Sequence, residues 1–344
     1  MADPTLPTPW QPAQPAVPSN PWTVDAPANL WDLKALLDQI NRDKAARIKE
    51  AFGRDISLSA LIDLLARFSL GQLSDVELVD VIEMGIYFAR SEIPWPEAAA
   101  NLEYWLVAGR DAKPARQMDH ELIMGLDYIV GTLCDEHYDA IVAGVNSRLM
   151  APAGTQFPEF AATFKGPSGE EIVVAPAASP LRAGGEETLY KDASTLPVGD
   201  RGDIYNAVGA VTLVSRATVK SEALDTGGWR VRIVDWECWF WDTYDWNKGV
   251  SVRIPINLFD RLGVTELQRS VIESALSVVG SKPSWLKELE VKDETMKQID
   301  GKQIRMPDDR VVQPKAFLVY GDSSWRFDAA ASCGKPIVLT IAPQ

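Results

Sequence analysis

The spacing of apolar residues changes near Pro152, and this change limits what the chain can fold into. From Leu30 to about Met150, apolar residues recur at intervals of three and four, which predicts amphipathic helices. After Pro152, proline, glycine and serine are frequent through Gly202, and short β-rich runs replace the helical period. We therefore expect an α+β protein, with an N-terminal all-helical domain followed by a mainly antiparallel β domain with one or two helices.

The length of the chain supports more than one folding unit. At 344 residues it exceeds what one hydrophobic core usually serves. Residues 1–27 hold eight prolines and neither lysine nor arginine, so we expect an extended, proline-rich arm. The remaining segments are predicted to be a helical domain at 28–150, a linker at 151–202 and an α+β domain at 203–344.

Local signals place the ends of the expected elements. Helix boundaries are indicated by Gly53, by Asp55 or Ser57, by a Ser74–Glu77 capping box, and by Pro94 and Pro96 with Gly109. A fifth helix is expected to run roughly from His120 to Leu149. Strands are expected at 207–219, 229–241, 250–254, 316–320 and 337–341, with a helix from Thr265 to about Val279. The Gly227-Gly228 pair predicts a long antiparallel hairpin between the first two strands.

Charge and cysteine usage limit the partners and the compartment. The net charge of −14 opposes nucleic acid as the main partner. Cys134, Cys238 and Cys333 lie far apart and form no CxxC pair, so neither a zinc site nor a disulfide framework is expected, which is typical of a reducing compartment. With no signal-like N-terminus and no run of about 18 apolar residues, we expect a soluble protein without an integral membrane segment, cytoplasmic in the producing cell. Action outside that cell would need a route other than a signal peptide.

The segment from Trp236 to Asn247 is the most function-like part of the sequence. It concentrates four of the twelve tryptophans and three carboxylates within twelve residues. If it is a strand, one face carries Val231, Ile233, Asp235, Glu237, Trp239 and Trp241, and the other carries Arg232, Val234, Trp236, Cys238, Phe240 and Asp242. Large rings on both faces predict a central strand that is covered on both sides.

The polar end of this segment allows several interpretations. Asp242, Asp245 and Asn247 could bind a hard cation such as Mg²⁺ or Ca²⁺ where the strand passes into a turn. The two aspartates could instead divide acid and base roles if their surroundings separate their pKa values. A plain hairpin turn and ligand stacking on the tryptophans are the alternatives.

Three short segments carry a family resemblance: NLEYWL at 101–106, GDIYNAVG at 202–209 and DTYDWN at 242–247. Together they resemble a loosely defined group of bacterial proteins often encoded with type VI secretion or polymorphic-toxin systems. The resemblance spans about residues 80 to 325. It implies a role in antagonism between bacteria, and it implies no particular reaction.

The Asp242-Thr243-Tyr244-Asp245 block also resembles the active-site motif of colicin M-like toxins, phosphatases that act on the lipid-linked peptidoglycan precursor. That resemblance implies catalytic roles for Asp242, Tyr244 and Asp245. In the family, a His-Arg pair follows the second aspartate. Here no histidine occurs after His137, and Arg253 is the nearby basic candidate. A metal-bound water or another acid-base group would have to replace the histidine.

Other motifs favour structural roles. Gly321-Asp322-Ser323-Ser324 resembles the nucleophile block of GDSL-type esterases, but no histidine follows it, so we interpret it as a strand-ending turn. His120 and His137 are seventeen residues apart, and with Cys134 they form a poor set of metal ligands. Both histidines are expected on a helix surface or in the core.

Two functional hypotheses follow. The first is an antibacterial effector, delivered by a type VI-like contractile system, whose rear domain acts on a cell-envelope target, such as a phosphate-containing peptidoglycan precursor. Its site would comprise Asp242, Tyr244 and Asp245, with Arg253 as an anion-binding partner. The second is a non-enzymatic adaptor, chaperone or immunity component of the same system. Either protein would have a secretion-system or immunity protein as its partner.

Overall fold

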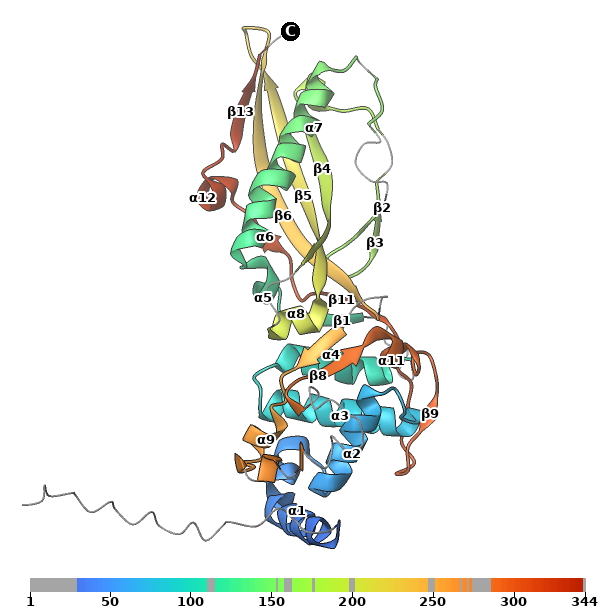
Figure 1. The fold of residues 1–344 in the computed structure, drawn as a ribbon. Helices are drawn as coiled ribbons and strands as arrows, with labels where there is room; N and C mark the ends of the chain where they lie inside the picture. The colour runs from blue at the N-terminus through green and yellow to red at the C-terminus, as the bar shows by residue number, and fades with distance from the viewer. Residues whose placement is uncertain are drawn as a thin grey trace, which may run out of the picture.

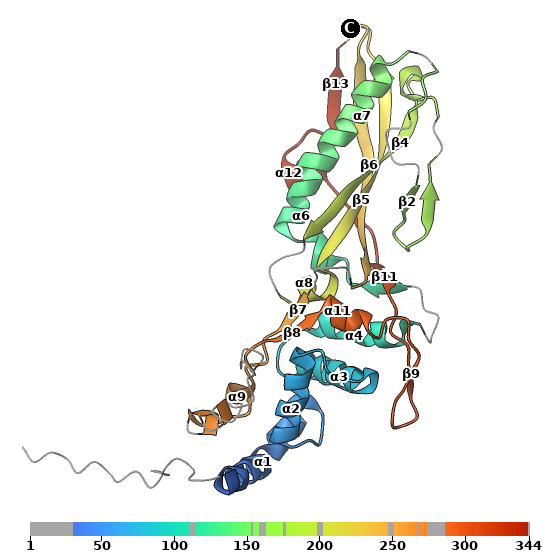
Figure 2. The same cartoon turned by 45° about the vertical axis from the view of Figure 1, so that its right-hand side comes forward.

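The computed structural model describes residues 30–109, 115–152, 154–157, 163–174, 177–197, 202–246, 251–266, 268–270, 272–273 and 286–342. The fold is α+β, as the sequence predicts: a helical N-terminal region precedes a mainly antiparallel sheet. Figure 1 shows two lobes stacked end to end, and Figure 2 shows the same arrangement from a second side. The lower lobe comprises described residues from 30–108 and 251–312, and the upper lobe comprises those from 115–246 and 317–342.

The lower lobe begins with helices whose ends follow the expected signals. They are α1 (Leu30–Phe52), α2 (Leu58–Ser69), α3 (Asp75–Ser91) and α4 (Pro96–Ala108). Ser57 caps α2 by accepting the Ala60 N–H, and Ser74 and Glu77 form the complete capping box of α3. Gly53 follows α1 with a φ of 64°, a left-handed conformation that glycine adopts without steric cost.

The expected fifth helix is broken into several pieces, preceded by a strand. These elements are β1 (Ala115–Met118), α5 (Glu121–Met124), α6 (Asp127–Thr132), a π-helical turn η1 (Leu133–His137) and α7 (Tyr138–Met150). Gly125 ends α5, and Leu126 is extended before α6 begins. The pieces pack on the sheet, α7 and η1 against β4 and α5 against β6, so these helices belong spatially to the upper lobe.

A seven-stranded sheet forms the upper lobe. Its strands are β1, β4 (Glu186–Pro197), β5 (Ala210–Ala223), β6 (Trp229–Tyr244), β11 (Phe317–Gly321), β12 (Trp325–Arg326) and β13 (Val338–Ile341). The Gly227-Gly228 hairpin is confirmed, because β5 and β6 pair antiparallel on either side of it. On its other edge β6 pairs in turn with β11, β12 and β13. Region 151–202, expected to be a linker, contributes β4 as well as the hairpin of β2 (Thr163–Lys165) and β3 (Glu171–Val173), and the short η2 turn (Leu181–Ala183).

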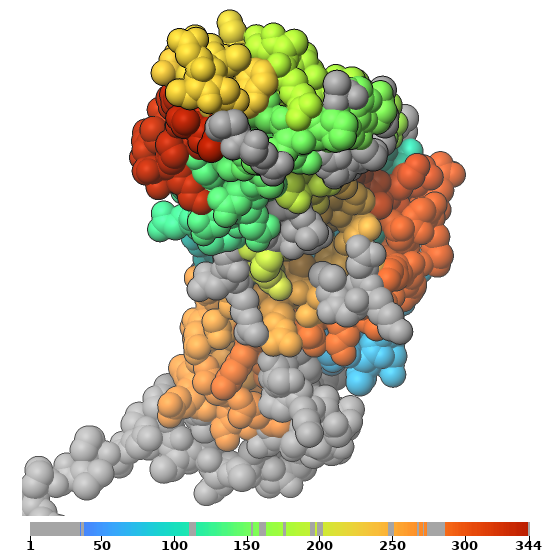
Figure 3. Space-filling model, turned by 90° about the horizontal axis from the view of Figure 1, so that it is seen from above, coloured from blue at the N-terminus to red at the C-terminus, as the bar shows by residue number. Residues whose placement is uncertain are grey.

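Strand β6 is covered on both faces, as predicted. Trp236 and Phe240 lie in the main core, with exposures of 3% and 0%. Trp239, 1% exposed, packs with Phe164 on the other face, and its indole N–H donates to the Lys165 carbonyl at 2.7 Å. From above, the β5–β6 turn, α7 and the C-terminal segment close the end of the upper lobe (Figure 3).

The expected assignment of side chains to faces is wrong for the first part of β6. Val231 and Ile233 share the main core with Trp236, although strict alternation puts them on the opposite face. The cause is a β-bulge: Thr218 pairs with Asp235 and Val219 pairs with Ile233, which leaves one extra residue in β6. Side chains alternate between the two faces of a strand, and the extra residue of a bulge reverses this alternation. Residues before the bulge therefore lie on the face opposite to the one that strict alternation predicts.

The lower lobe is completed by segments that return from the sheet. They are β7 (Ser251–Ile254) paired with β8 (Leu289–Lys292), α9 (Leu258–Arg261), α11 (Asp293–Lys297), and the hairpin of β9 (Ile304–Arg305) and β10 (Val311–Val312). Of the expected 265–279 helix, 266, 268–270 and 272–273 are helical, Thr265 precedes the helical residues, and the other positions lie outside the described residues. None of the helices in the described ranges combines the length and apolar character needed to cross a bilayer.

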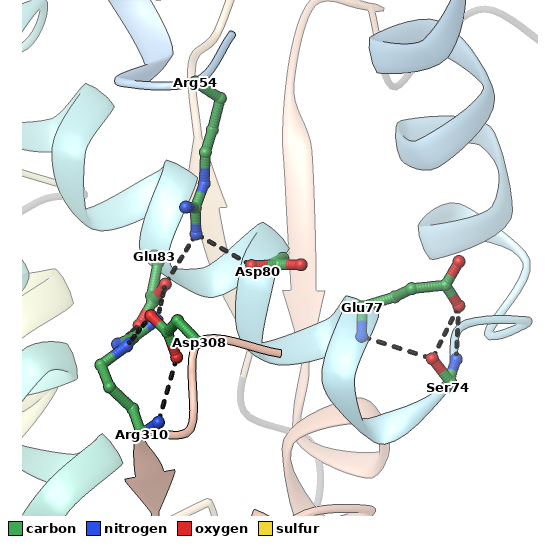
Figure 4. A network of polar contacts seen from close by, with 7 residues as sticks. All are labelled: Arg54, Ser74, Glu77, Asp80, Glu83, Asp308 and Arg310. Carbon is green, nitrogen blue, oxygen red and sulfur yellow. Dashed lines mark hydrogen bonds and ion pairs between the residues drawn. The ribbon is translucent and has the colours of Figure 1, made fainter. Parts of the chain in front are cut away.

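Ion pairs hold the β9–β10 hairpin against α3 (Figure 4). Arg310 donates to both carboxylate oxygens of Glu83, at 2.5 and 3.1 Å, and also to Asp308. Arg54, which follows α1, reaches Glu83 at 2.7 Å and Asp80 at 2.9 Å. Glu83 therefore joins two segments that are more than 250 residues apart in the sequence.

Cys134 and Cys333 form a disulfide, contrary to the expectation of unpaired cysteines. Their Cα atoms are 5.6 Å apart although 199 positions separate them in the sequence. The pairing arises because β13 adds to β6 while η1 packs on the same sheet, which brings the end of α12 (Ala329–Cys333) against η1. Wide spacing along the sequence therefore did not indicate wide spacing in the fold. Cys238 is buried and free.

Thiol counting tests the disulfide. The full chain, refolded with oxidised glutathione and then denatured without reductant, should expose one reactive thiol, that of Cys238, and three after reduction. Reduction should lower the free energy of unfolding by about 2–4 kcal/mol, since the bridge restricts the unfolded chain. Cys238→Ser, the control, should leave no reactive thiol before reduction. Three reactive thiols in the oxidised wild type would contradict the pairing.

Candidate functional site

Residues 101–106, 202–209 and 242–246 lie together where the two lobes join. The Asn101 side chain in α4 donates to the Ala207 carbonyl of α8 (Asp203–Val208) at 2.7 Å. The Asp203 carboxylate accepts the backbone N–H groups of Glu97 and Ala98 at 3.1 and 2.8 Å, which satisfies the first turn of α4. Figure 1 shows α4, α8, β1 and β11 gathered at this junction.

Aromatic rings connect the end of β6 to α4 and β11. Trp246 lies edge-on to Trp105 of α4, with ring centroids 6.0 Å apart. Tyr244 contacts Trp246 at 6.1 Å and stacks on Phe317 of β11 at 5.1 Å, and Phe317 in turn contacts Tyr104 at 4.5 Å. The end of β6 is thus packed between α4 and β11.

Asp242 lies on β6 two residues before Tyr244, on the same face of the strand. It is paired with Val319 of β11, and Val319 is paired with Arg116 of β1, so these three residues form one row across three strands. Burial raises the pKa of the Asp242 carboxyl to about 8, helped by the negative charge of Asp245 and opposed by the hydrogen bond from the Thr243 backbone. Asp242 is therefore mainly protonated at neutral pH, which suits an acid-base group.

The Tyr244 phenol is influenced by two charged groups of opposite sign, Arg116 and Asp242. Burial raises the pKa of its phenol, the charge of Arg116 lowers it and that of Asp242 raises it. Arg116 is held in place by hydrogen bonds to Glu97, at 2.8 Å, and to Asn101. The sequence did not indicate Arg116 as a basic group of this junction. Arg116 lies on β1, a short strand that the spacing of apolar residues did not predict.

Several buried polar atoms at the junction lack a partner among the described residues. They are the indole nitrogens of Trp105 and Trp246 and the hydroxyl oxygen of Tyr244. Buried donors of this kind normally make hydrogen bonds, if only to ordered water. Three within one ring cluster therefore indicate a place that can take up water or a polar ligand group.

The other residues expected at the site are placed differently. Asp245 follows β6, where burial and the charge of Asp300 raise the pKa of its carboxyl and the charge of Lys297 lowers it. Arg253 lies on β7 and forms ion pairs with Glu288 at 3.6 Å and Glu290 at 3.5 Å. Asn247 lies outside the described residues, so the expected Asp242–Asp245–Asn247 metal site stays a prediction. Asp242, Tyr244 and Asp245 are brought together, and Arg253 is engaged by other carboxylates.

His120 and His137 lie in different parts of the upper lobe. His137 is buried in η1, and its Nδ1 lies 2.7 Å from the Ser215 hydroxyl, so the expected core position is confirmed; burial lowers its pKa to about 3. His120 follows β1, and its Nδ1 lies 2.7 Å from the Ser323 hydroxyl and 3.1 Å from Asp322. The Gly321–Ser324 turn does end a strand, as expected. No histidine follows this turn in the sequence, but in the fold His120, which is 202 residues before Asp322, lies beside it.

Comparisons with known proteins identify no relative. No family model, no curated protein and no solved structure matches the chain. The assignment of a function therefore depends on the geometry of the junction.

The pH dependence of stability tests the surroundings of Asp242. Because its pKa is about 8 in the folded chain and about 3.9 in the unfolded chain, the contribution of Asp242 to stability should be lost as the pH rises from about 4 to about 8. Asp242→Asn cannot ionise, so its stability relative to the wild type should increase over this window, by roughly 4–6 kcal/mol. Urea unfolding at pH 4, 6 and 8 measures the difference.

Asp75→Asn serves as the control with the opposite sign. Hydrogen bonds from Lys302 and Gln298 lower the pKa of Asp75. Its ionised form is therefore favoured by folding, and removing the charge should destabilise the protein at neutral pH but not at low pH. A difference between Asp242→Asn and the wild type that does not vary with pH would contradict the assignment to Asp242.

Proposed function

We propose that this protein is an antibacterial effector that hydrolyses a phosphate-containing precursor of the cell envelope, with Asp242 as its proton donor. The observation that carries the proposal is the partly buried, mainly protonated Asp242 beside Tyr244, at the junction of α4, α8 and the end of β6. Buried carboxyl groups with raised pKa values are typical of general acids. The resemblance of residues 242–245 to the colicin M-like motif supports the same reaction class.

The two aspartates suit the two proton transfers of a hydrolysis. Water attacks phosphorus as the bond from phosphorus to the leaving oxygen breaks. Asp242 gives its proton to the leaving oxygen, and the Asp245 carboxylate accepts the proton released by the attacking water. Burial raises the pKa of both carboxyls, and the charge of Lys297 lowers that of Asp245, which favours Asp245 as the ionised member of the pair.

In this proposal the basic group of the site is Arg116 in place of Arg253. Arg116 shares the row of Asp242 across the sheet and acts on the pKa of Tyr244, and its pairing with Glu97 fixes its position. A guanidinium favours phosphate because its planar donors match the oxyanion geometry. The Tyr244 hydroxyl is a further donor for the same anion.

The Cys134–Cys333 disulfide supports action in an oxidising compartment. Such bonds persist outside the cytosol and in the bacterial periplasm, where envelope precursors are exposed. A protein made in the cytoplasm would form the bond only after export, which agrees with delivery by a secretion machine. The secretion-system or immunity partner is part of this proposal.

Targeted expression tests the proposal. The chain is produced in a bacterial host either in the cytoplasm or, behind a cleavable signal sequence, in the periplasm. Periplasmic wild type should stop growth and cytoplasmic wild type should not. Asp242→Asn and Asp245→Ala should restore growth, and Tyr244→Phe, which removes only a hydroxyl, should reduce toxicity by about tenfold or more.

Asp235→Ala is the matched control, because Asp235 also lies on β6 but its side chain is 41% exposed and pairs with Arg326. It should remain toxic. Release of phosphate from a lipid-linked precursor by the purified chain distinguishes hydrolysis from other causes of growth arrest. Harmless wild type in both compartments, with the protein folded, would rule out the effector and favour the non-enzymatic adaptor or immunity component.

A further inference from the structure

Two short loops meet beyond the only parallel strand pair described in the main sheet. Asp119 and His120 directly follow β1, and Asp322 directly follows β11. The Asp322 N–H donates to the Met118 carbonyl at 2.7 Å, and the His120 N–H donates to the Asp322 carboxylate at 3.1 Å. The carboxyl ends of parallel strands commonly carry functional side chains, because neighbouring loops emerge there side by side.

The ligand atoms of these residues converge. One donor atom each from Asp119, His120 and Asp322 lies within 4.8 Å of the others. The His120 Nδ1 is 3.1 Å from an Asp322 oxygen and 3.9 Å from an Asp119 oxygen. Ligands about 2.1 Å from a shared metal ion are about 3.0 to 3.4 Å apart in octahedral or tetrahedral geometry, so small side-chain rotations suffice to complete a site.

The backbone provides a close approach for the histidine. A Cβ atom at Gly321 would lie 3.0 Å from the His120 Cβ and 3.2 Å from the Phe240 ring. Contacts this short require a shift of the neighbours, so glycine at 321 allows the His120 loop to approach β11. The position of the imidazole is thus fixed by packing as well as by its hydrogen bonds.

The same atoms do not form a serine nucleophile with its relay. In a Ser-His-Asp triad the hydroxyl and the carboxylate bind different nitrogens of the imidazole. Here the Ser323 hydroxyl and the Asp322 carboxylate both approach Nδ1. These contacts are hydrogen bonds around Nδ1, and a cation bound by Nδ1 would take the place of the shared proton.

We propose that Asp119, His120 and Asp322 bind a divalent transition-metal ion, Zn²⁺ or Mn²⁺. An imidazole among carboxylates favours these ions over Ca²⁺ and Mg²⁺, which select oxygen ligands alone. The side chains of Asp119 and Asp322 are about half exposed and that of His120 is 22% exposed, so an ion reaches the site from solvent and keeps bound water. This site uses different residues from the proposed catalytic group at Asp242.

Calorimetric titration of the untagged full chain, stripped with a chelator, tests the proposal. ZnCl₂ and MnCl₂ should each bind to the oxidised wild type at one site per chain. His120→Ala and Asp322→Asn should weaken binding by about 100-fold or more, because each removes a ligand. Asp55→Asn, which alters an exposed carboxylate outside the cluster, should leave the affinity unchanged.

Further variants make the result decisive. Ser323→Ala should bind within about threefold of the wild type, since the hydroxyl is a neighbour and no ligand in this assignment. Circular dichroism and melting temperature establish folding, and His120→Asn replaces His120→Ala if the latter does not fold. Absence of binding to the wild type, or undiminished binding to folded His120 and Asp322 variants, would overturn the proposal, as would loss of binding in Ser323→Ala alone.

Discussion

The main-chain pairing of β6 is the interaction on which the rest of the molecule depends. One edge of this strand pairs with β5 along its length, and the other edge pairs with β11, β12 and β13 in succession. The last three strands of the chain are therefore added to the hairpin of β5 and β6, which comes earlier in the sequence. Both sets of functional candidates follow from this pairing, because Asp322 directly follows β11 and β11 fixes the row that includes Asp242. The disulfide also depends on it, since β13 brings Cys333 toward η1.

The junction between the lobes unites buried polar groups with aromatic packing. Asn101, Arg116 and Asp203 connect α4 to β1 and α8 through hydrogen bonds, while Trp105 and Tyr244 connect α4 and β11 to the end of β6 through ring contacts. Burying such groups is costly unless they are paired, and the paired ones here join segments that are distant in sequence. The groups left without a described partner, together with the raised pKa of Asp242, are what distinguish this junction from an ordinary interface between lobes.

The sequence predicted the helix ends and the turn that depend on residues close together in the chain. Ser57, Ser74 and Gly53 place helix ends because caps and left-handed glycines act within one turn. The Gly227-Gly228 turn predicted the β5–β6 hairpin, and rings on both sides of β6 predicted a strand covered on both faces. The face assignment of Val231 and Ile233 was wrong, because a bulge depends on how the partner strand pairs. Among the candidate site residues, Asp242, Tyr244 and Asp245 lie close together because they are neighbours in the sequence, and their role stays a prediction.

The sequence by itself determined the α+β class, the first four helices, the central hairpin and the carboxylates at the end of β6, since all of these depend on periodicity or on residues a few positions apart. Only the tertiary structure decided that Arg116 approaches Tyr244, that Cys134 pairs with Cys333, and that His120 meets Asp322. Each of these contacts joins residues more than 100 positions apart. They form because strands that are distant in the sequence add to the same sheet. The main-chain hydrogen bonds that pair these strands are the same for nearly every residue type, so a single sequence does not reveal which strands pair.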